Sequence, residues 1–104
     1  GIRLGDIDDE FITPIYRKYG LEHARTFGTG HSFGIMHYWY GRDEIGEIRP
    51  YNDAILEPGM VLSIEPMISI EGVGGFKHAD MFIVHEDGVE QLTNFDNGVI
   101  VIEP

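Results

Sequence analysis

A glycine-rich segment places one histidine where it could take part in chemistry. Residues 28–34 read Gly-Thr-Gly-His-Ser-Phe-Gly, so His31 stands on a backbone that can approach another segment closely or take a positive φ. A histidine on such a backbone is a candidate metal ligand, acid–base group or hydrogen-bond donor to an oxyanion. A glycine-rich bend whose histidine only contacts a backbone carbonyl is the alternative. The segment is not a phosphate-binding loop, because no Gly-Lys-Ser or Gly-Lys-Thr follows it.

Glu65 is the second candidate, because it lies in the apolar run 61–68. A carboxylate in such a run costs free energy unless it is paired or bound to a ligand. Alternation along a strand would put Ser63 on the same face as Glu65. Pro66 requires that the strand end, bulge or lie at a sheet edge there. A glutamate on an edge strand that faces water is the alternative interpretation.

Three further polar side chains could contribute to a site. Arg42 could hold a substrate carboxylate with two parallel hydrogen bonds, although a local ion pair with Asp43 or Glu44 is the simpler interpretation. His78 and Asp80 would share one face of a strand, where they could form part of a metal site. A solvated histidine is the alternative for His78.

One helix is predicted ahead of these candidates, over residues 6–19. Acidic residues fill its first turn, Arg17 and Lys18 lie in its last turn, and Gly20 follows, which suits the helix dipole and a glycine end signal. Pro14 should kink or break this helix. A spacing of four places one apolar face at Ile7, Phe11, Ile15 and Tyr19.

The rest of the chain predicts a mostly antiparallel sheet. Residues 61–65, 67–70, 81–84, 89–92 and 99–102 are rich in strand-forming side chains, and residues 86–88 form a turn signal between two of these runs. One helix followed by such strands is typical of an α+β fold rather than of alternating βαβ units.

Composition limits the classes of partner. The chain has 104 residues, no cysteine and a formal net charge of −11. The lack of cysteine excludes thiolate metal sites and suits a reducing, cytoplasmic compartment. An acidic surface repels phosphate backbones, so we expect no nucleic-acid partner. No run of about 18 apolar residues occurs, so we expect no membrane partner. Because the chain starts at Gly1, we expect a piece of a longer protein.

Taken in order, the motifs resemble those of the pita-bread hydrolases, which include creatinase, prolidase, aminopeptidase P and methionine aminopeptidase. The resemblance runs from about Gly5 to Thr93 and includes Gly-His-Ser-Phe-Gly, Leu-Glu-Pro-Gly-Met-Val, Ile-Glu-Pro-Met, Gly-Gly-Phe-Lys-His-Ala-Asp and Glu-Asp-Gly-Val-Glu-Gln-Leu-Thr. Gly-His-Ser-Phe-Gly together with Tyr-Gly-Arg is closest in pattern to creatinase. The resemblance implies that residues 1–104 are the C-terminal portion of a pita-bread catalytic domain, with one main helix and a curved sheet.

The resemblance also implies a ligand set. The peptidases hold two metal ions with two Asp, one His and two Glu, and the His and first Glu correspond to His31 and Glu65. The second Glu corresponds to Ala79, which has no donor atom, and the two Asp would lie upstream of Gly1. We therefore expect no dinuclear metal site and no cofactor. If the peptidase alternative holds instead, the cofactor would be a divalent metal such as Mn, Co or Zn.

The resemblance to creatinase implies a hydrolase that cleaves a C–N bond of a small guanidino or amino-acid substrate. His31 and Glu65 would then be catalytic, and Arg42, Phe33 and His37 would bind the substrate. Two alternatives remain: an Xaa-Pro dipeptidase or aminopeptidase with an incomplete metal site, and a pita-bread domain that binds a partner without catalysis. We expect the 104 residues alone to be inactive, and the family resemblance implies a homo-oligomer, commonly a homodimer.

Overall fold

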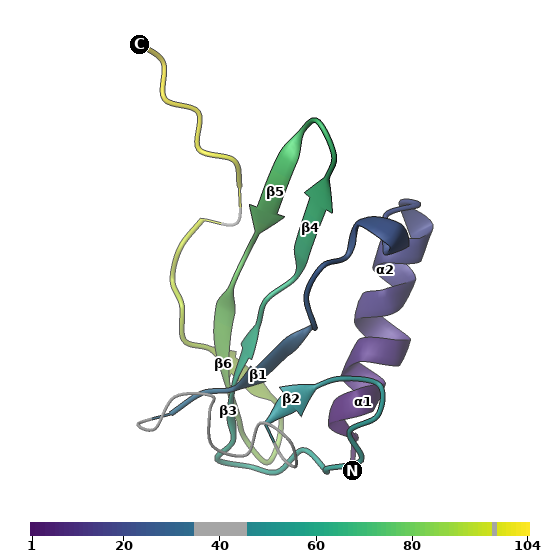
Figure 1. The fold of residues 1–104 in the computed structure, drawn as a ribbon. Helices are drawn as coiled ribbons and strands as arrows, with labels where there is room; N and C mark the ends of the chain where they lie inside the picture. The colour runs from purple at the N-terminus through teal and green to yellow at the C-terminus, as the bar shows by residue number, and fades with distance from the viewer. Residues whose placement is uncertain (35–45, 97) are drawn as a thin grey trace.

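The computed structural model describes residues 1–34, 46–96 and 98–104. A helical segment along one side of the sheet comes first, and an antiparallel sheet follows (Figure 1). In chain order the elements are α1 (Leu4–Asp6), η1 (Ile7–Ile12), α2 (Thr13–Lys18), η2 (Glu22–Ala24), β1 (Gly30–Ser32), β2 (Glu47–Ile48), β3 (Val61–Ile64), β4 (Met67–Ile70), β5 (Gly74–Lys77), β6 (Asp80–Val84) and β7 (Val89–Gln91). The predicted α+β class is confirmed.

The elements α1, η1 and α2 form one continuous helix, in which η1 is a π-helix. The wider π-turns lie immediately before Pro14, whose ring would clash with the carbonyl four residues earlier in a regular helix. The proline therefore changes the local winding without ending the helix. The predicted end is confirmed: Gly20 has a φ of 67°, and the Leu21 N–H donates to the Tyr16 carbonyl at 2.8 Å.

The buried face of the helix differs from the predicted one. Of the four positions in the predicted apolar face, Ile7 packs against the core, whereas the other three are more than half exposed: Phe11, Ile15 and Tyr19. The residues that the helix buries are instead Leu4, Gly5, Asp8 and Tyr16. The prediction fails because a carboxylate was not expected inside, yet Asp8 is fully buried against an arginine.

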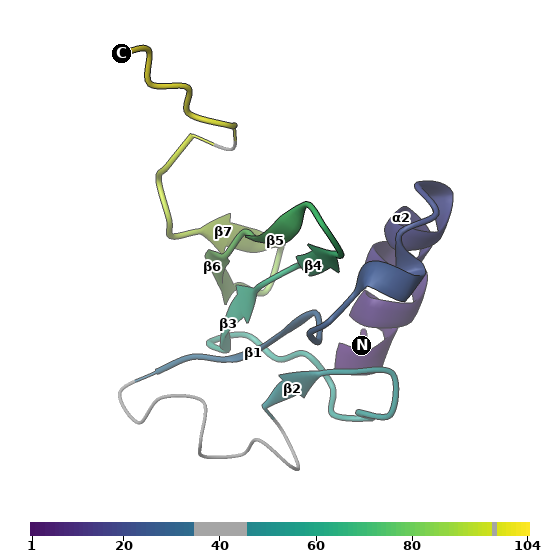
Figure 2. The ribbon, with the colours of Figure 1, turned by 45° about the horizontal axis from the view of Figure 1, so that its top comes forward.

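The main sheet has five strands in the order β2-β1-β3-β6-β7, and every pairing in it is antiparallel. β4 and β5 form a separate two-stranded sheet. Figure 2 shows β7, β6, β3, β1 and β2 following one another across the molecule, with the helix to one side. The sequence predicted β3, β4, β6 and β7. β1, β2 and β5 were not predicted, because they are short or rich in glycine.

The β3–β6 and β4–β5 pairs are two parts of one long hairpin. Ile64 lies opposite Asp80 in the first pair, and Met67 lies opposite Lys77 in the second. The same register holds between the pairs, because the His78 N–H donates to the Pro66 carbonyl at 3.2 Å. Glu65 therefore lies opposite Ala79, at the point where Pro66 ends β3 as predicted.

The core joins the helix to the sheet. Its buried members come from α1, β2, β3 and β6, and they are Leu4, Ile48, Leu62 and Val84. Five partly buried apolar side chains pack against them: Ile7, Ala54, Leu56, Met60 and Ile64. Within the described residues, no helix is both long and apolar enough to cross a membrane.

The C-terminal segment corrects one prediction. Residues 99–102 were expected to form a strand, but they carry no strand structure, and their side chains are between 62% and 93% exposed. Figure 1 shows this segment extending away from the sheet, so strand-forming side chains there have no neighbouring strand to pair with.

Candidate functional site

His31, Ser63 and Glu65 project from one face of the sheet. His31 lies opposite Ser63 in the β1–β3 pair, and opposite residues of antiparallel strands share a face. Ser63 and Glu65 are two residues apart, so they share that face as predicted. A Cβ on Gly30 would lie 1.9 Å from the Ser63 carbonyl oxygen, so glycine is required for this close strand approach.

Glu65 is buried and every oxygen of its carboxylate has a partner. Its Oε1 accepts a hydrogen bond from the Ser63 hydroxyl at 2.7 Å and lies 3.3 Å from His31 Nε2. Its Oε2 lies 2.6 Å from the ammonium nitrogen of Lys77. The glutamate is 8% exposed, which rules out the alternative that it faces water.

The charge of Glu65 is stabilised by these contacts. Burial acts to raise the pKa of the Glu65 carboxyl, but the hydrogen bonds from Lys77 and Ser63 outweigh burial and hold the pKa below its ordinary value. Glu65 is therefore ionised at neutral pH, as a residue that stabilises a positively charged group must be.

His31 is held in one orientation. Its Nδ1 lies 2.8 Å from the carbonyl oxygen of Ser32, and a carbonyl can only accept, so Nδ1 carries a hydrogen. The other ring nitrogen, Nε2, faces Glu65. The Phe33 ring is stacked beside the imidazole, with 6.3 Å between ring centroids. The imidazole is thus fixed by one hydrogen bond and one ring contact, with Nε2 directed into the site.

A buried polar cluster supports the site from behind. The Asp8 carboxylate accepts hydrogen bonds from both terminal nitrogens of Arg25 and from the hydroxyls of Thr13 and Thr29. The Thr29 carbonyl in turn accepts the Glu65 N–H at 2.7 Å. The cluster therefore connects the helix, through Thr29, to the backbone of Glu65. Sequence reasoning missed it, because its members lie far apart in the chain.

His78, Ala79 and Asp80 divide between two faces. His78 Nε2 lies 2.7 Å from Asp80 Oδ2, so these two share a face as predicted. The hydroxyl of Thr93 and then His78 hold the pKa of Asp80 below its ordinary value. Ala79, opposite Glu65, belongs to the other face.

The residues present do not fit the family's dinuclear metal centre. His31 Nε2 and Glu65 Oε1 converge as two ligands would. Ala79, opposite Glu65, offers no donor atom, and the Lys77 ammonium takes the second oxygen of Glu65. Among the residues that the structure describes, no group of three or more His, Cys, Asp or Glu side chains could hold a metal ion.

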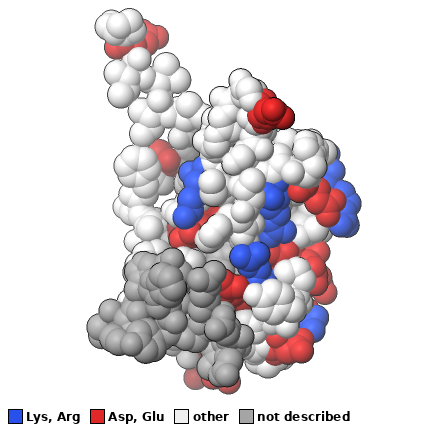
Figure 3. Space-filling model, viewed as in Figure 1, with Lys and Arg blue, Asp and Glu red and all other residues white. Residues whose placement is uncertain are grey.

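Lys77 is a site residue that sequence reasoning missed, although alternation offered a signal: Lys77 is two residues from Ala79 and so shares the face of Glu65. Its ammonium also lies 5.2 Å from the centroid of the Phe27 ring. In the space-filling view, Lys and Arg side chains lie beside Asp and Glu side chains near the middle of the side of the molecule that is shown (Figure 3). Arg42 and His37, predicted to bind substrate, lie in segment 35–45, outside the described residues.

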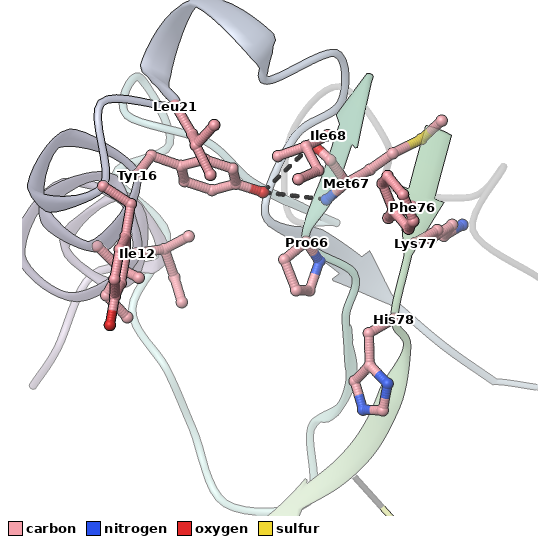
Figure 4. Close-up of a pocket in the computed structure, with 11 residues that line it drawn as sticks. Ile12, Tyr16, Leu21, Pro66, Met67, Ile68, Phe76, Lys77 and His78 are labelled. Carbon is pink, nitrogen blue, oxygen red and sulfur yellow. Dashed lines mark hydrogen bonds between the residues drawn. The ribbon is translucent and has the colours of Figure 1, made fainter. Parts of the chain in front are cut away.

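An apolar groove separates the helix from the β4–β5 hairpin, with a volume of about 380 Å³. Figure 4 shows its lining, in which the Tyr16 hydroxyl accepts the Met67 N–H at 3.0 Å and donates to the Met67 carbonyl at 3.3 Å. Tyr16 therefore fixes the start of β4, directly after Pro66. The groove's lining includes no acidic side chain.

Comparison with known proteins places the chain in a family. A model described as metallopeptidase family M24 matches residues 1–86. Creatinase from Bacillus sp. (strain B-0618) is 44% identical, with 94% of this chain and 25% of the creatinase covered. Agropine synthesis cyclase from Rhizobium rhizogenes is 36% identical, with 94% and 23% covered. In a solved structure, Xaa-Pro dipeptidase from Bacillus anthracis matches with a TM-score of 0.84 at 27% identity, with 98% of this chain and 27% of that chain covered.

The chain thus spans about a quarter of the length of the proteins it matches. The family match covers most of the chain, and the solved neighbours include prolidases that share its arrangement of helix and antiparallel sheet. The chain therefore belongs to metallopeptidase family M24 and has part of the pita-bread fold that its motifs predicted.

Proposed function

We propose that the parent of this chain is a creatinase-like hydrolase that cleaves a C–N bond of a small guanidino or amino-acid substrate. The observation that carries this proposal is the buried contact between His31 and the ionised Glu65, at 3.3 Å. The same site has Ala79, which offers no donor atom, where the family's metal centre has a glutamate. The identity to creatinase, at 44%, supports the same class of reaction.

In this proposal His31 donates or accepts a hydrogen bond at the reacting centre through Nε2. Because the His31 ring is already fixed, Nε2 does not have to be oriented during the reaction. Glu65 stabilises positive charge, either on the imidazole or on a cationic substrate nitrogen. Arg42 would bind the substrate carboxylate, and Phe33 and His37 would line the pocket, as the resemblance implies.

Lys77 limits how a guanidinium could bind. A carboxylate has about four acceptor positions. Ser63 occupies one on Oε1, Lys77 occupies one on Oε2, and His31 Nε2 lies 3.3 Å from Oε1. A guanidinium would therefore have to bind Glu65 beside these groups unless the Lys77 side chain, 45% exposed, swings away. We expect the substrate to compete with Lys77 rather than to meet an empty carboxylate.

The test is steady-state kinetics of the full-length parent with creatine, related guanidino acids and small amides. Glu65→Gln and His31→Gln should each lower kcat/KM by about 100-fold or more, since each removes a group placed at the reacting centre. The matched controls are Glu90→Gln and His85→Gln, which alter a second His–Glu pair, 3.0 Å apart and exposed on the surface. Full activity of the Glu65→Gln variant would sink the proposal.

An Xaa-Pro dipeptidase is the second candidate, because the solved Xaa-Pro dipeptidase from Bacillus anthracis matches 98% of this chain. This candidate predicts metal-dependent turnover of Xaa-Pro dipeptides by the parent and no turnover of guanidino acids. Turnover of neither class by the parent would favour a non-catalytic binding domain. Self-association of the parent stays a prediction, which light scattering would check.

A further inference from the structure

The backbone of Thr29 connects to both residues that we propose to be catalytic. Its carbonyl accepts the Glu65 N–H at 2.7 Å, and Thr29 precedes His31 by two residues, just before β1 begins. Glu65 is followed by Pro66, which has no N–H to donate, so β3 ends there. The Thr29 carbonyl therefore holds the backbone of Glu65 on the side of β1, at the point where the strand pairing stops.

The side chain of Thr29 is anchored in the interior. The residue is 0% exposed. Its hydroxyl donates to Asp8 Oδ2 at 2.6 Å and accepts from Arg25 Nη2 at 2.8 Å. A β-branched side chain is stiff at χ1, so fixing its hydroxyl also fixes the backbone that carries it. The two hydrogen bonds of the hydroxyl therefore determine where the Thr29 carbonyl lies.

The anchor itself has little freedom to move. A guanidinium has five N–H donors in a fixed plane. Each of the five on Arg25 has an acceptor, and these are the Phe27 carbonyl, the Asp8 carboxylate and the hydroxyls of Thr13 and Thr29. Arg25 also forms an isolated antiparallel bridge with Ile68, three residues after Glu65. The ion pair is thus fixed on both sides of the segment that carries Glu65.

We propose that Thr29 is a positioning residue that sets where His31 Nε2 and the Glu65 carboxylate lie relative to the substrate. The Asp8–Arg25 pair fixes the Thr29 hydroxyl, and the Thr29 backbone transmits that placement to both residues. The positioning role rests on the proposed function, because His31 and Glu65 must be the reacting groups. Thr29 itself is buried and touches no substrate, so its effect should fall mainly on kcat.

The experiment is steady-state kinetics of the full-length parent carrying Thr29→Val. Valine keeps the shape of threonine and removes the hydroxyl. Because a misplacement of about 1 Å can cost about 100-fold in rate, kcat should fall by about 10-fold to 100-fold, with a smaller change in KM. Thr29→Ser keeps the hydroxyl and should restore most of kcat. All rates are measured well below the unfolding temperature of each variant, so that loss of folded protein does not contribute.

Thr13→Val is the matched control. The Thr13 hydroxyl donates to Asp8 Oδ1 at 2.7 Å and accepts from Arg25 Nη1 at 2.9 Å. Its backbone lies in α2 and not at the site. Thr13→Val should therefore lower the unfolding temperature, as Thr29→Val does, and leave kcat near that of the wild type. Equal losses of kcat in the two variants would overturn the positioning role of Thr29.

A measurement without substrate separates this proposal from the proposed function. In the full-length parent labelled with ¹³C-histidine, the ring signal of His31 is assigned by its loss in His31→Gln. Thr29→Val should shift that signal, and Thr13→Val should not. An unshifted His31 signal, or a wild-type kcat, in Thr29→Val would overturn the positioning role. Full activity of Glu65→Gln would instead refute the proposed function, whatever the His31 signal does.

Discussion

Replacing Asp8 with asparagine should destabilise the fold strongly, because the Asp8 carboxylate is a fully buried charge with a matched partner. Arg25 binds both oxygens of Asp8, and the hydroxyls of Thr13 and Thr29 complete the shell at 2.7 and 2.6 Å. Burial acts to raise the pKa of Asp8, but the hydrogen bonds from Arg25 and the threonines hold the pKa below its ordinary value. Asparagine keeps the size of the side chain and removes the charge.

The magnitude follows from what the substitution leaves behind. The Arg25 side chain is 17% exposed and would lose its only buried anion among the described residues. Breaking one partner of a buried ion pair costs about 3–5 kcal/mol, and a domain of this size has about 5–15 kcal/mol of stability in total. With a urea dependence of about 1.5 kcal/mol per molar, the unfolding midpoint should fall by about 2–3 M.

The assay is urea unfolding of the 104-residue chain, followed by far-ultraviolet circular dichroism. Asp53→Asn is the matched control, because Asp53 also pairs with an arginine, Arg3 at 2.7 Å, but is 81% exposed; its midpoint should not move. Equal midpoints for Asp8→Asn and Asp53→Asn would refute the reasoning. Asp8→Asn combined with Arg25→Met should lose less than the sum of the single changes, because the unpaired charge is then removed as well.

Three other changes test parts of the structure. Gly30→Ala should prevent β1 from pairing, because the added Cβ would lie 1.9 Å from a backbone oxygen. Gly75→Ala should fold normally, because its added Cβ would lie 3.5 Å from the nearest neighbouring atom. Two-dimensional NMR spectra of both variants check this, and a well-folded Gly30→Ala chain would contradict it. Tyr16→Phe removes the hydroxyl that bonds both backbone groups of Met67 and should cost about 1–2 kcal/mol in urea unfolding; wild-type stability would count against it. The pKa of Asp8 is lower in the folded state, so its contribution is complete above about pH 4 and is lost as pH falls through the folded pKa; acid unfolding should show this loss, and Asp8→Asn should flatten it.

Much of the fold was predictable because its signals are local. β3, β4, β6 and β7 are runs of strand-forming side chains bounded by turn residues. Pro66 ends β3 because it has no N–H to donate, and Gly20 ends the helix because it takes a positive φ of 67°. Each of these outcomes depends on the backbone chemistry of one or two residues.

The failed predictions involve partners distant in the chain. Residues 99–102 have the composition of a strand, but composition does not provide a neighbouring strand. The buried face of the helix was misassigned because Asp8 can be buried only when Arg25, 17 residues later, supplies its charge and hydrogen bonds. An apolar pattern cannot reveal a buried carboxylate whose partner lies in another element.

The candidate site was partly readable. The residue types of His31, Ser63 and Glu65 and the alternation of β3 were enough to nominate them, and Ala79 was recognisable as a position without a donor. What the sequence by itself determined is which side chains could do chemistry and which strand carries Glu65, since both follow from residue type and a period of two. Only the tertiary structure decided that His31 contacts Glu65 and that the Lys77 ammonium balances the charge of Glu65. It also decided that the Asp8 cluster supports the backbone of Glu65 through Thr29. Those contacts depend on strand register and on the approach of β1 to β3, which no local pattern specifies.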